Sequence, residues 1–411
     1  MLQSLASRRW VVVIAAALCV ILLADPLAAS AQAAIDYTEK KQHAQELYRQ
    51  NKMADAIPVL EELAAANDKD TEVFAALGFA LYSMTLAAGN TQEREQLAAR
   101  ARTALNRAKQ LGDNSALTDL TLSRLQGGAP PPSKFSRNPE ADLSMQQAEA
   151  DFVKGELAQA IDLYKRALSL DPKLYEAALY IGDSYYKSPG GMSQAPEWYA
   201  KAIAIDPNRE TAYRYWADVL MKQGDSDGAR DKYVEAYISE PFDKLALTGF
   251  TTWAKNHHVT LAHPAITIPG GFERKQNGDT NITLDGSALD KKNSGASAWI
   301  MYGITRSTWS NEKFLKTYPK EKTYRHSLGE EADALRMVLS GIDAKARKSP
   351  DLDPSLAILL KLEQQGELEA YILLARSDEG IGKDYPSYLR EHRDQVRNYV
   401  VDWVLRGGHA R

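Results

Sequence analysis

The sequence predicts an all-α protein, in which a helical solenoid is followed by a C-terminal helical domain, with a short β or irregular insert between them. The clearest observation is an internal repeat from Asp142 to Pro241. Its prolines, Pro172, Pro207 and Pro241, are 35 and then 34 residues apart. A period of this length, with helical apolar spacing and a proline stop, is typical of stacked helix pairs. Three further columns keep one residue type in every copy: Ala160, Ala195 and Ala229; Tyr164, Tyr199 and Tyr233; Ala167, Ala202 and Ala236.

The composition is that of an ordinary globular protein. Hydrophobic residues make up 44% and charged residues 25% of the 411 residues, which leaves room for two or three domains with a sizeable core. A net charge of −4 without a long basic run makes nucleic acid and anionic membrane surfaces poor partners. We therefore expect no binding to nucleic acid.

The first residues carry the features of an export signal. Arg8 and Arg9 precede an uncharged apolar core of 15 residues from Trp10 to Ala24, shorter than the roughly 20 residues that span a bilayer. Small-x-small cleavage sites follow at 29–31 and 31–33. We expect a cleaved signal, a periplasmic or secreted chain, and no stable membrane insertion after cleavage. The alternative is an uncleaved signal that tethers the chain to an inner membrane.

Cys19, the only cysteine, lies inside that signal. A mature chain would therefore have no thiol. This excludes disulfides, thiolate zinc sites and cysteine nucleophiles together.

The chain divides into six predicted segments. Residues before the central repeats have helical spacing and are interpreted as two degenerate copies of the same helix pair, with an ordinary four-helix arrangement as the alternative. Three consecutive prolines, 130–132, cannot continue a helix and favour an extended connector. The segments are a signal peptide (1–31), degenerate N-terminal repeats (35–125), a Pro-rich linker (126–141), the repeat array with a capping helix (142–257), a hairpin or irregular segment (258–295) and a C-terminal helical domain (296–411).

The central repeats also agree in the residues of their first helices. One copy has Ala178, Ile181, Gly182 and Tyr185, and the next has Tyr213, Trp216, Ala217 and Leu220. With the Ala, Tyr, Ala and Pro columns of the second helices, this pattern resembles the tetratricopeptide repeat. The resemblance implies a non-enzymatic array that binds another protein or a peptide in an inner groove.

The resemblance also implies which side chains line that groove. The family uses first-helix residues that point away from the second helices. Glu149, Asp183 and Asp218 occupy a position where an asparagine often sits, and their charge would repel a peptide carboxylate. The alternative is that these side chains merely solvate the concave face. By position the groove residues are Phe152, Leu179, Asp183, Tyr186, Arg214, Asp218, Met221 and Lys222.

After the repeats the pattern changes twice. Residues 266–268 and 281–284 alternate as strands do, and the Asn277-Gly278 turn signal predicts a hairpin that sets Phe272 opposite Thr283. The block from 296 is helical again and resembles no characterised family. Its helix signals are a capping box from Ser327 to Glu330, Asp353-Pro354 with a stop at Gly366, and a final helix after Pro386.

Two short motifs suggest hydrolase chemistry. Gly224 to Gly228 matches G-x-S-x-G, with Ser226 at the nucleophile position. That motif needs a strand before the serine and a helix after it. Here it falls between two helices of a repeat, and Gly182-Asp183-Ser184 falls within a helix, so we interpret both as parts of the repeats.

Histidines and arginines gather after residue 256 without a site-like spacing. His257, His258 and His263 lie close in sequence but lack a metal-ligand pattern such as H-E-x-x-H, and we expect neither a metal nor a cofactor. Arg390, Arg393 and Arg397 are interpreted as a solvated helix face that pairs with its own acids.

These observations favour an exported adaptor that binds a protein partner through the groove of the repeats. Two alternatives stay open. One is an enzyme of unknown reaction in the C-terminal domain, with the repeats as a targeting arm and His326, Glu331, Asp384 and Tyr385 as its candidate residues. The other is a purely structural envelope-assembly factor.

Overall fold

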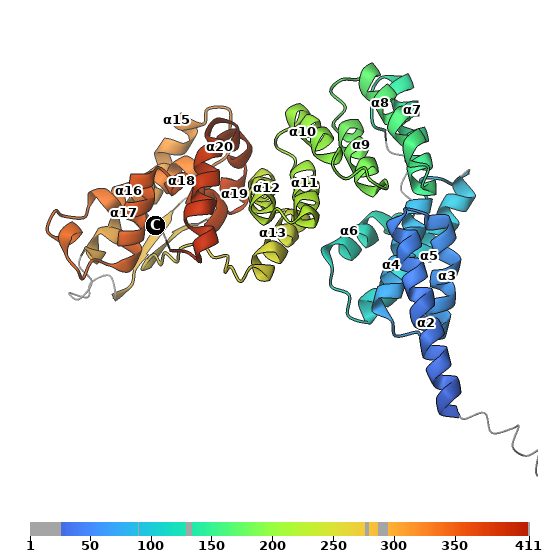
Figure 1. Cartoon of the computed structure of the whole chain (residues 1–411). Helices are drawn as coiled ribbons and strands as arrows, with labels where there is room; N and C mark the ends of the chain where they lie inside the picture. Colours follow the sequence, from blue (N-terminus) through green and yellow to red (C-terminus); the bar gives the residue numbers. More distant parts are fainter. Residues whose placement is uncertain (1–25, 89, 129–133, 276–278, 287–294, 410–411) are drawn as a thin grey trace, which may run out of the picture. The chain divides into compact units, whose positions relative to one another are not determined.

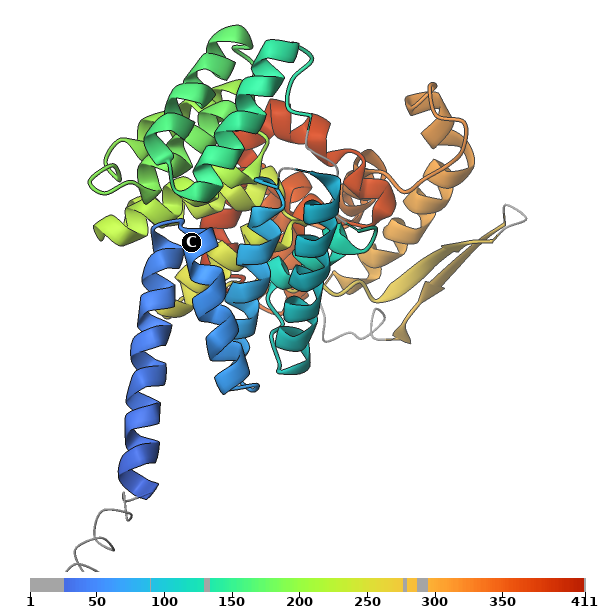
Figure 2. The ribbon, with the colours of Figure 1, turned by 90° about the vertical axis from the view of Figure 1, so that its right-hand side faces the viewer.

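The chain forms two compact units, Met1–Asp206 and Pro207–Arg411, in a computed structural model (Figures 1 and 2). The described residues are 26–88, 90–128, 134–275, 279–286 and 295–409. Most of the predicted signal peptide, Cys19, prolines 130–132 and the Asn277-Gly278 turn lie outside them. Among the described residues, none of the helices combines the length and apolarity that a membrane crossing requires.

The first unit is built from helix pairs, as the repeat predicts. Helices that follow one another along the chain pack together as α2/α3, α4/α5, α7/α8 and α9/α10, and α8 also packs on α9. The helices of this unit are α2 (Pro26–Arg49), α3 (Met53–Ala66), α4 (Thr71–Met84), α5 (Thr91–Gln110), α6 (Ala116–Leu125), α7 (Pro139–Lys154), α8 (Leu157–Leu170), α9 (Tyr175–Lys187) and α10 (Ala195–Ile205).

Small residues let the paired helices approach closely. Ala160 and Ala167 on α8 have no exposed surface. On α9, a Cβ atom at Gly182 would lie only 2.6 Å from Cε1 of Tyr199 on α10. The tyrosine ring therefore fills space that any larger residue at position 182 would need, which is how the repeat columns produce tight packing.

The second unit contains the last helix pair and the C-terminal block. The helices α11 and α12 pair, and α13 packs on α12. Its regular elements are α11 (Glu210–Gln223), α12 (Ser226–Ser239), α13 (Lys244–Asn256), β1 (Gly270–Arg274), β2 (Thr280–Leu284), α14 (Ile300–Thr308), α15 (Phe314–Thr317), α16 (Leu328–Ser340), α17 (Pro354–Gln365), α18 (Leu368–Ala375), α19 (Glu379–Gly382) and α20 (Tyr385–Asp402). Shorter helical turns are η2 (Ala296–Trp299), the π-helical η3 (Trp309–Lys313), η4 (Ala346–Lys348) and η5 (Val404–Arg406).

One hydrophobic core runs through the second unit. It joins Tyr233 and Phe250 of the last repeat and capping helix to Trp299, Leu335 and Tyr399 of the C-terminal block. The helix α20 also packs on α12. The last helix pair and the C-terminal block therefore fold as one body.

The hairpin register predicted from the sequence is wrong by one residue. Phe272 pairs with Ile282, and Gly271 pairs with Thr283. The strands are centred on residue 277 rather than between 277 and 278, and Lys275 N–H donates to the Asp279 carbonyl at 2.8 Å. This register places two apolar side chains opposite each other, and the hairpin packs on α14, where Thr280 Oγ1 lies 2.8 Å from Ser307 Oγ.

The predicted self-pairing of the arginines of α20 is wrong for Arg393 and Arg397. Arg393 donates to Glu235 on α12 at 2.9 Å and to the Ser239 hydroxyl at 2.9 Å. Arg397 lies 3.3 Å from the second oxygen of Glu235. Because α20 packs on α12, acids of the repeat are nearer to these guanidinium groups than the acids of their own helix.

Candidate functional site

The predicted groove residues of the first unit lie on α7 and α9. Phe152 is half-buried, with the Lys187 ammonium 5.1 Å from its ring centroid. Leu179 is only 4% exposed, so it contributes to packing. Asp183 and Tyr186 are partly exposed. The accessible surface of this unit's predicted groove is therefore aromatic and charged.

The acidic position of the repeats faces a tyrosine of the second helix. The Tyr164 hydroxyl donates a hydrogen bond to Glu149. Burial raises the pKa of Glu149, the hydrogen bond from Tyr164 lowers it and the nearby Asp183 raises it, and the net result is a pKa of about 7. Burial also raises the pKa of Asp183, against the effect of Lys187. Protonation of Glu149 and Asp183 would reduce the negative charge that the sequence predicts for this part of the groove.

The remaining predicted groove residues lie on α11 in the second unit. Arg214 donates to both carboxylate oxygens of Glu210, at 2.8 and 3.1 Å. Asp218 accepts a hydrogen bond from Tyr233 at 2.5 Å, and burial raises its pKa. Met221 is partly buried against the core of this unit, whereas Lys222 is exposed. Arg214 is thus a partner of a buried acid, and Lys222 is the accessible cation.

A cavity of about 430 Å³ lies between α2, α3 and α4 in the first unit. Lys41, Tyr48 and Arg49 line it from α2, and Lys41 forms ion pairs with Asp70 at 2.8 Å and Glu72 at 2.9 Å. These residues belong to no motif in the sequence. The helical spacing of α2 and α4 could have indicated this cavity, because a helix pair that repeats the central pattern has an inner face of its own.

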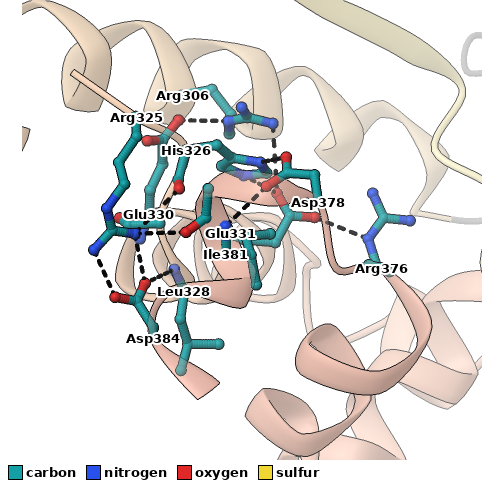
Figure 3. Close-up of polar contacts among 12 residues, drawn as sticks. Arg306, Arg325, His326, Leu328, Glu330, Glu331, Arg376, Asp378, Ile381 and Asp384 are labelled. Atoms are coloured by element: carbon teal, nitrogen blue, oxygen red, sulfur yellow. Dashed lines mark hydrogen bonds and ion pairs between the residues drawn. The ribbon is translucent and has the colours of Figure 1, made fainter. Parts of the chain in front are cut away.

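The enzyme alternative of the C-terminal block depends on four side chains, of which the structure brings two together. His326 Nε2 lies 3.1 Å from Glu331 Oε2, and His326 Nδ1 lies 2.6 Å from Asp378 Oδ2 (Figure 3). Asp384 instead accepts from Arg325 at 2.6 Å and from the Leu328 N–H at 2.8 Å. The fourth, Tyr385, is buried and donates to the carbonyl of Ile238 on α12 at 2.6 Å.

Glu331 is the centre of a buried ion-pair network. It accepts from Tyr302 at 2.8 Å and from Arg376 at 2.9 Å, and Arg306 lies at 3.5 Å. Burial alone would raise the pKa of Glu331, but the hydrogen bond from His326 and the charges of Arg376 and Arg306 outweigh it and hold the pKa at about 2. The network joins α14, α16 and the end of α18, as Figure 3 shows. This geometry indicates that the network stabilises the packing of these helices.

The capping box that begins α16 is half-formed. Ser327 Oγ accepts the Glu330 N–H at 3.3 Å, as predicted. The Glu330 carboxylate does not return to the cap but accepts from Arg306 at 2.6 Å and Tyr324 at 2.8 Å. The stronger charge-assisted bond to an arginine displaces the local one.

Ser226 of the G-x-S-x-G motif is the first residue of α12, directly after the turn at Gly224 and Asp225 that separates it from α11. Its Oγ is 2.6 Å from His257 Nε2, a contact that the sequence did not indicate. The other ring nitrogen, Nδ1, lies 2.8 Å from the Trp253 carbonyl. His263 contacts Tyr399 at 2.7 Å instead. Within the described ranges, no group of three or more His, Cys, Asp or Glu side chains is placed to hold a metal ion.

The family comparison concerns the centre of the array. Residues 145–210 match the model of the tetratricopeptide repeat family. The chain carries tetratricopeptide repeats. These repeats are helix-pair units whose arrays present extended concave surfaces to other proteins. The match includes α8, α9 and α10, where the alanine and tyrosine columns are clearest. No curated protein matches the chain.

Solved tetratricopeptide-repeat structures are similar to parts of this chain. The Sgt2 domain of Aspergillus fumigatus is 24% identical, with 31% of this chain and 85% of that chain covered and a TM-score of 0.28. The first repeat domain of Spaghetti bound to an HSP90 peptide is 16% identical, covers 31% and 99%, and has a TM-score of 0.28. YrrB, described as having an unusual peptide-binding site, is 14% identical, covers 54% and 97%, and has a TM-score of 0.26.

The raised pKa of Glu149, the buried acid of the first tetratricopeptide repeat, predicts how the stability of the fold depends on pH. Because the folded-state pKa of Glu149 is raised to about 7, the folded chain holds more protons than the unfolded chain between about pH 4.5 and 7, and stability falls as pH rises through that window. Glu149→Gln keeps an acceptor for Tyr164 but cannot ionise. We expect this variant to gain about 1–3 kcal/mol over the wild type between pH 5 and pH 8, measured by urea unfolding.

The control for this prediction is Glu140→Gln, at an exposed acid on the same helix. Its difference from the wild type should stay constant between the two pH values. A Glu149→Gln difference that also stays constant would contradict the assignment of a raised pKa to Glu149.

Proposed function

We propose that this chain is an exported, non-enzymatic adaptor that binds a peptide or helix of another protein along the first helices of its tetratricopeptide repeats. The observation that carries the proposal is the difference between the two helices of a repeat. The second helix α8 is locked in the core through Ala160, Tyr164 and Ala167, none of which is exposed. The first helix of the next repeat, α9, leaves Tyr186 partly accessible. Such a surface suits recognition of a protein partner.

The accessible side chains of the first helices indicate what kind of peptide they can bind. Lys222 on α11 and Lys187 on α9 supply cations, and Phe152 and Tyr186 supply aromatic area. Such mixtures of aromatic and charged groups are typical of peptide-binding grooves. The pKa of Glu149, raised to about 7, reduces the repulsion of an acidic peptide at this position. Arg214 is a poor probe because its removal would leave the buried Glu210 unpaired.

The test is capture of a partner by the mature chain from its native envelope. Tyr186→Ala combined with Lys222→Ala should fold normally and capture at least about tenfold less of the partner that the wild type binds stoichiometrically. The control is Lys201→Ala, at a cation 46% exposed on the second helix α10, which should capture as much as the wild type. Undiminished capture by the double variant would remove the first-helix surface from consideration.

Export has its own test. The positive start, the apolar core of 15 residues and the small-x-small sites support a cleaved signal. The N-terminal residue of the protein isolated from the producing cell should follow Ala31 or Ala33. A chain that keeps its first residues and sediments with membranes would instead support the tethered alternative.

A further inference from the structure

A cleft of about 570 Å³ lies in the C-terminal block of the second unit, away from the predicted groove residues. It is bordered by the π-helical segment η3, by the start of α16 and by the first half of α20. The repeat pattern predicts no function for this cleft. The cleft has the volume of a typical binding site for a small ligand or a few peptide side chains.

The two departures from regular α-helix on either side of this cleft are unusual. Trp309–Lys313 is a π-helical turn, and His392 interrupts α20 with φ −133° and ψ 33°. Trp309, Lys313 and His392 all line the cleft. Single π-turns are frequent at functional sites, and a break in a helix redirects the side chains on either side of it.

The cleft carries an excess of negative charge. The carboxylates of Asp333, Glu369, Asp384 and Glu391 line it, against the cations of Lys313 and Arg336. Two charged residues outside the lining pair with these groups: Arg325 pairs with Asp384, and Glu363 pairs with Arg336. They add one cation and one carboxylate, so the net charge of the cleft stays the same. Carboxylates therefore exceed cations by two. A concave surface of this kind concentrates positive charge.

The chain's own lysine displays the binding mode that the cleft offers. Lys313 Nζ lies 2.8 Å from Asp333 Oδ2 and 4.5 Å from the ring centroid of Trp309. An ammonium is thus held between a carboxylate and an aromatic face. Glu391 and Tyr388 offer the same two groups on α20, three residues apart and both in the lining, which places them on one face of the helix.

We propose that this cleft binds a basic segment of a partner protein, with an arginine or lysine side chain held by the carboxylate of Glu391 and the ring of Tyr388. The neighbouring Glu369 carboxylate already pairs with Arg336 at 2.6 Å. Glu391 is exposed and supplies charge that can pair with an incoming cation. Arginine fits best because its planar guanidinium stacks on tyrosine while it donates to a carboxylate. This site acts whether or not the repeats bind a peptide of their own.

The test measures fluorescence anisotropy of a short, labelled, terminally blocked peptide of alternating arginine and glycine, titrated with the full chain. We expect saturable binding that weakens as salt is added. Glu391→Lys should bind at least about tenfold more weakly, and Glu391→Gln should weaken binding less. The matched control is Glu379→Lys, at an exposed glutamate of the same unit that does not line the cleft, and it should bind like the wild type.

A peptide with glutamate in place of arginine should not bind. The Tyr186→Ala and Lys222→Ala double variant should keep its affinity for the arginine peptide, which separates this site from the repeats. The proposal is overturned if no binding occurs, if Glu391→Lys and Glu379→Lys bind equally, or if the double variant alone loses the peptide.

Discussion

Replacing Tyr199 by alanine should lower the free energy of unfolding of the repeats by about 3–5 kcal/mol, the range for deleting a large aromatic side chain from a core. Tyr199 is 1% exposed, and its ring occupies the space above Gly182 that no Cβ could share. Neighbouring helices cannot collapse into the resulting void, because α9 and α10 are already in contact along small residues. Urea unfolding of the full chain, followed by far-UV circular dichroism, measures the loss in its first transition.

The matched control for this variant is Tyr186→Ala. It removes the same ring from the partly exposed side of α9 and should cost no more than about 1 kcal/mol. Equal losses for the two variants would show that the tyrosine column does not hold the repeats together.

The second large effect is expected at Glu331, where Glu331→Gln should destabilise the second unit by about 3–5 kcal/mol at neutral pH. The side chain is 1% exposed and faces Arg376 and Arg306, themselves 24% and 12% exposed. Removing the carboxylate charge leaves these two guanidinium groups without their shared counter-ion. Thermal or urea unfolding of the full chain measures the difference.

The pH dependence of this effect has a defined sign. The folded-state pKa of Glu331 is lowered from 4.5 to about 2, so its contribution is present above about pH 4.5 and is lost as pH falls towards 2. The gap between wild type and Glu331→Gln should therefore narrow over that window. Glu379→Gln, at an exposed acid of the same unit, should show neither the loss nor the trend.

Signals that act within one helix pair could be read from the sequence. Gly155, Gly224 and Gly366 end helices in the left-handed region, with φ of 83°, 81° and 70°, because glycine adopts that conformation without strain. The tetratricopeptide columns likewise predicted which residues are buried in α8 and α10. These features depend on residues that are neighbours along the chain or one repeat apart.

Contacts between distant segments could not be predicted in the same way. Arg393 had acids available on its own helix, and only the docking of α20 on α12 decides that it binds Glu235, 158 residues away. His326 and Glu331 are close in sequence, but Asp378 joins them from 52 residues away. The hairpin register failed because the dipeptide Asn277-Gly278 suggested a two-residue turn, whereas the paired strands leave five residues between Arg274 and Thr280.

The predicted groove likewise combines features that the sequence indicates with features that only the structure shows. Its location followed from the repeat pattern, but the chemistry of its members depends on their partners. Arg214 and Asp218 looked like ligand-binding charges, and the structure pairs them with Glu210 and Tyr233. The Tyr164–Glu149 pair has the same spacing of 15 residues as Tyr233–Asp218. That shared spacing was present in the sequence and would have identified Glu149 and Asp218 as partners of the tyrosine column.

The central claim is that a partner protein contacts the first helices of the repeats, and site-specific photo-crosslinking tests it most directly. A photoreactive amino acid placed at Tyr186 or Lys222 should crosslink, in the producing cell, to one and the same partner chain. The same group at Lys201, on the second helix α10, should give no such product. A partner that crosslinks from position 201 and from neither of the other two would contradict the claim.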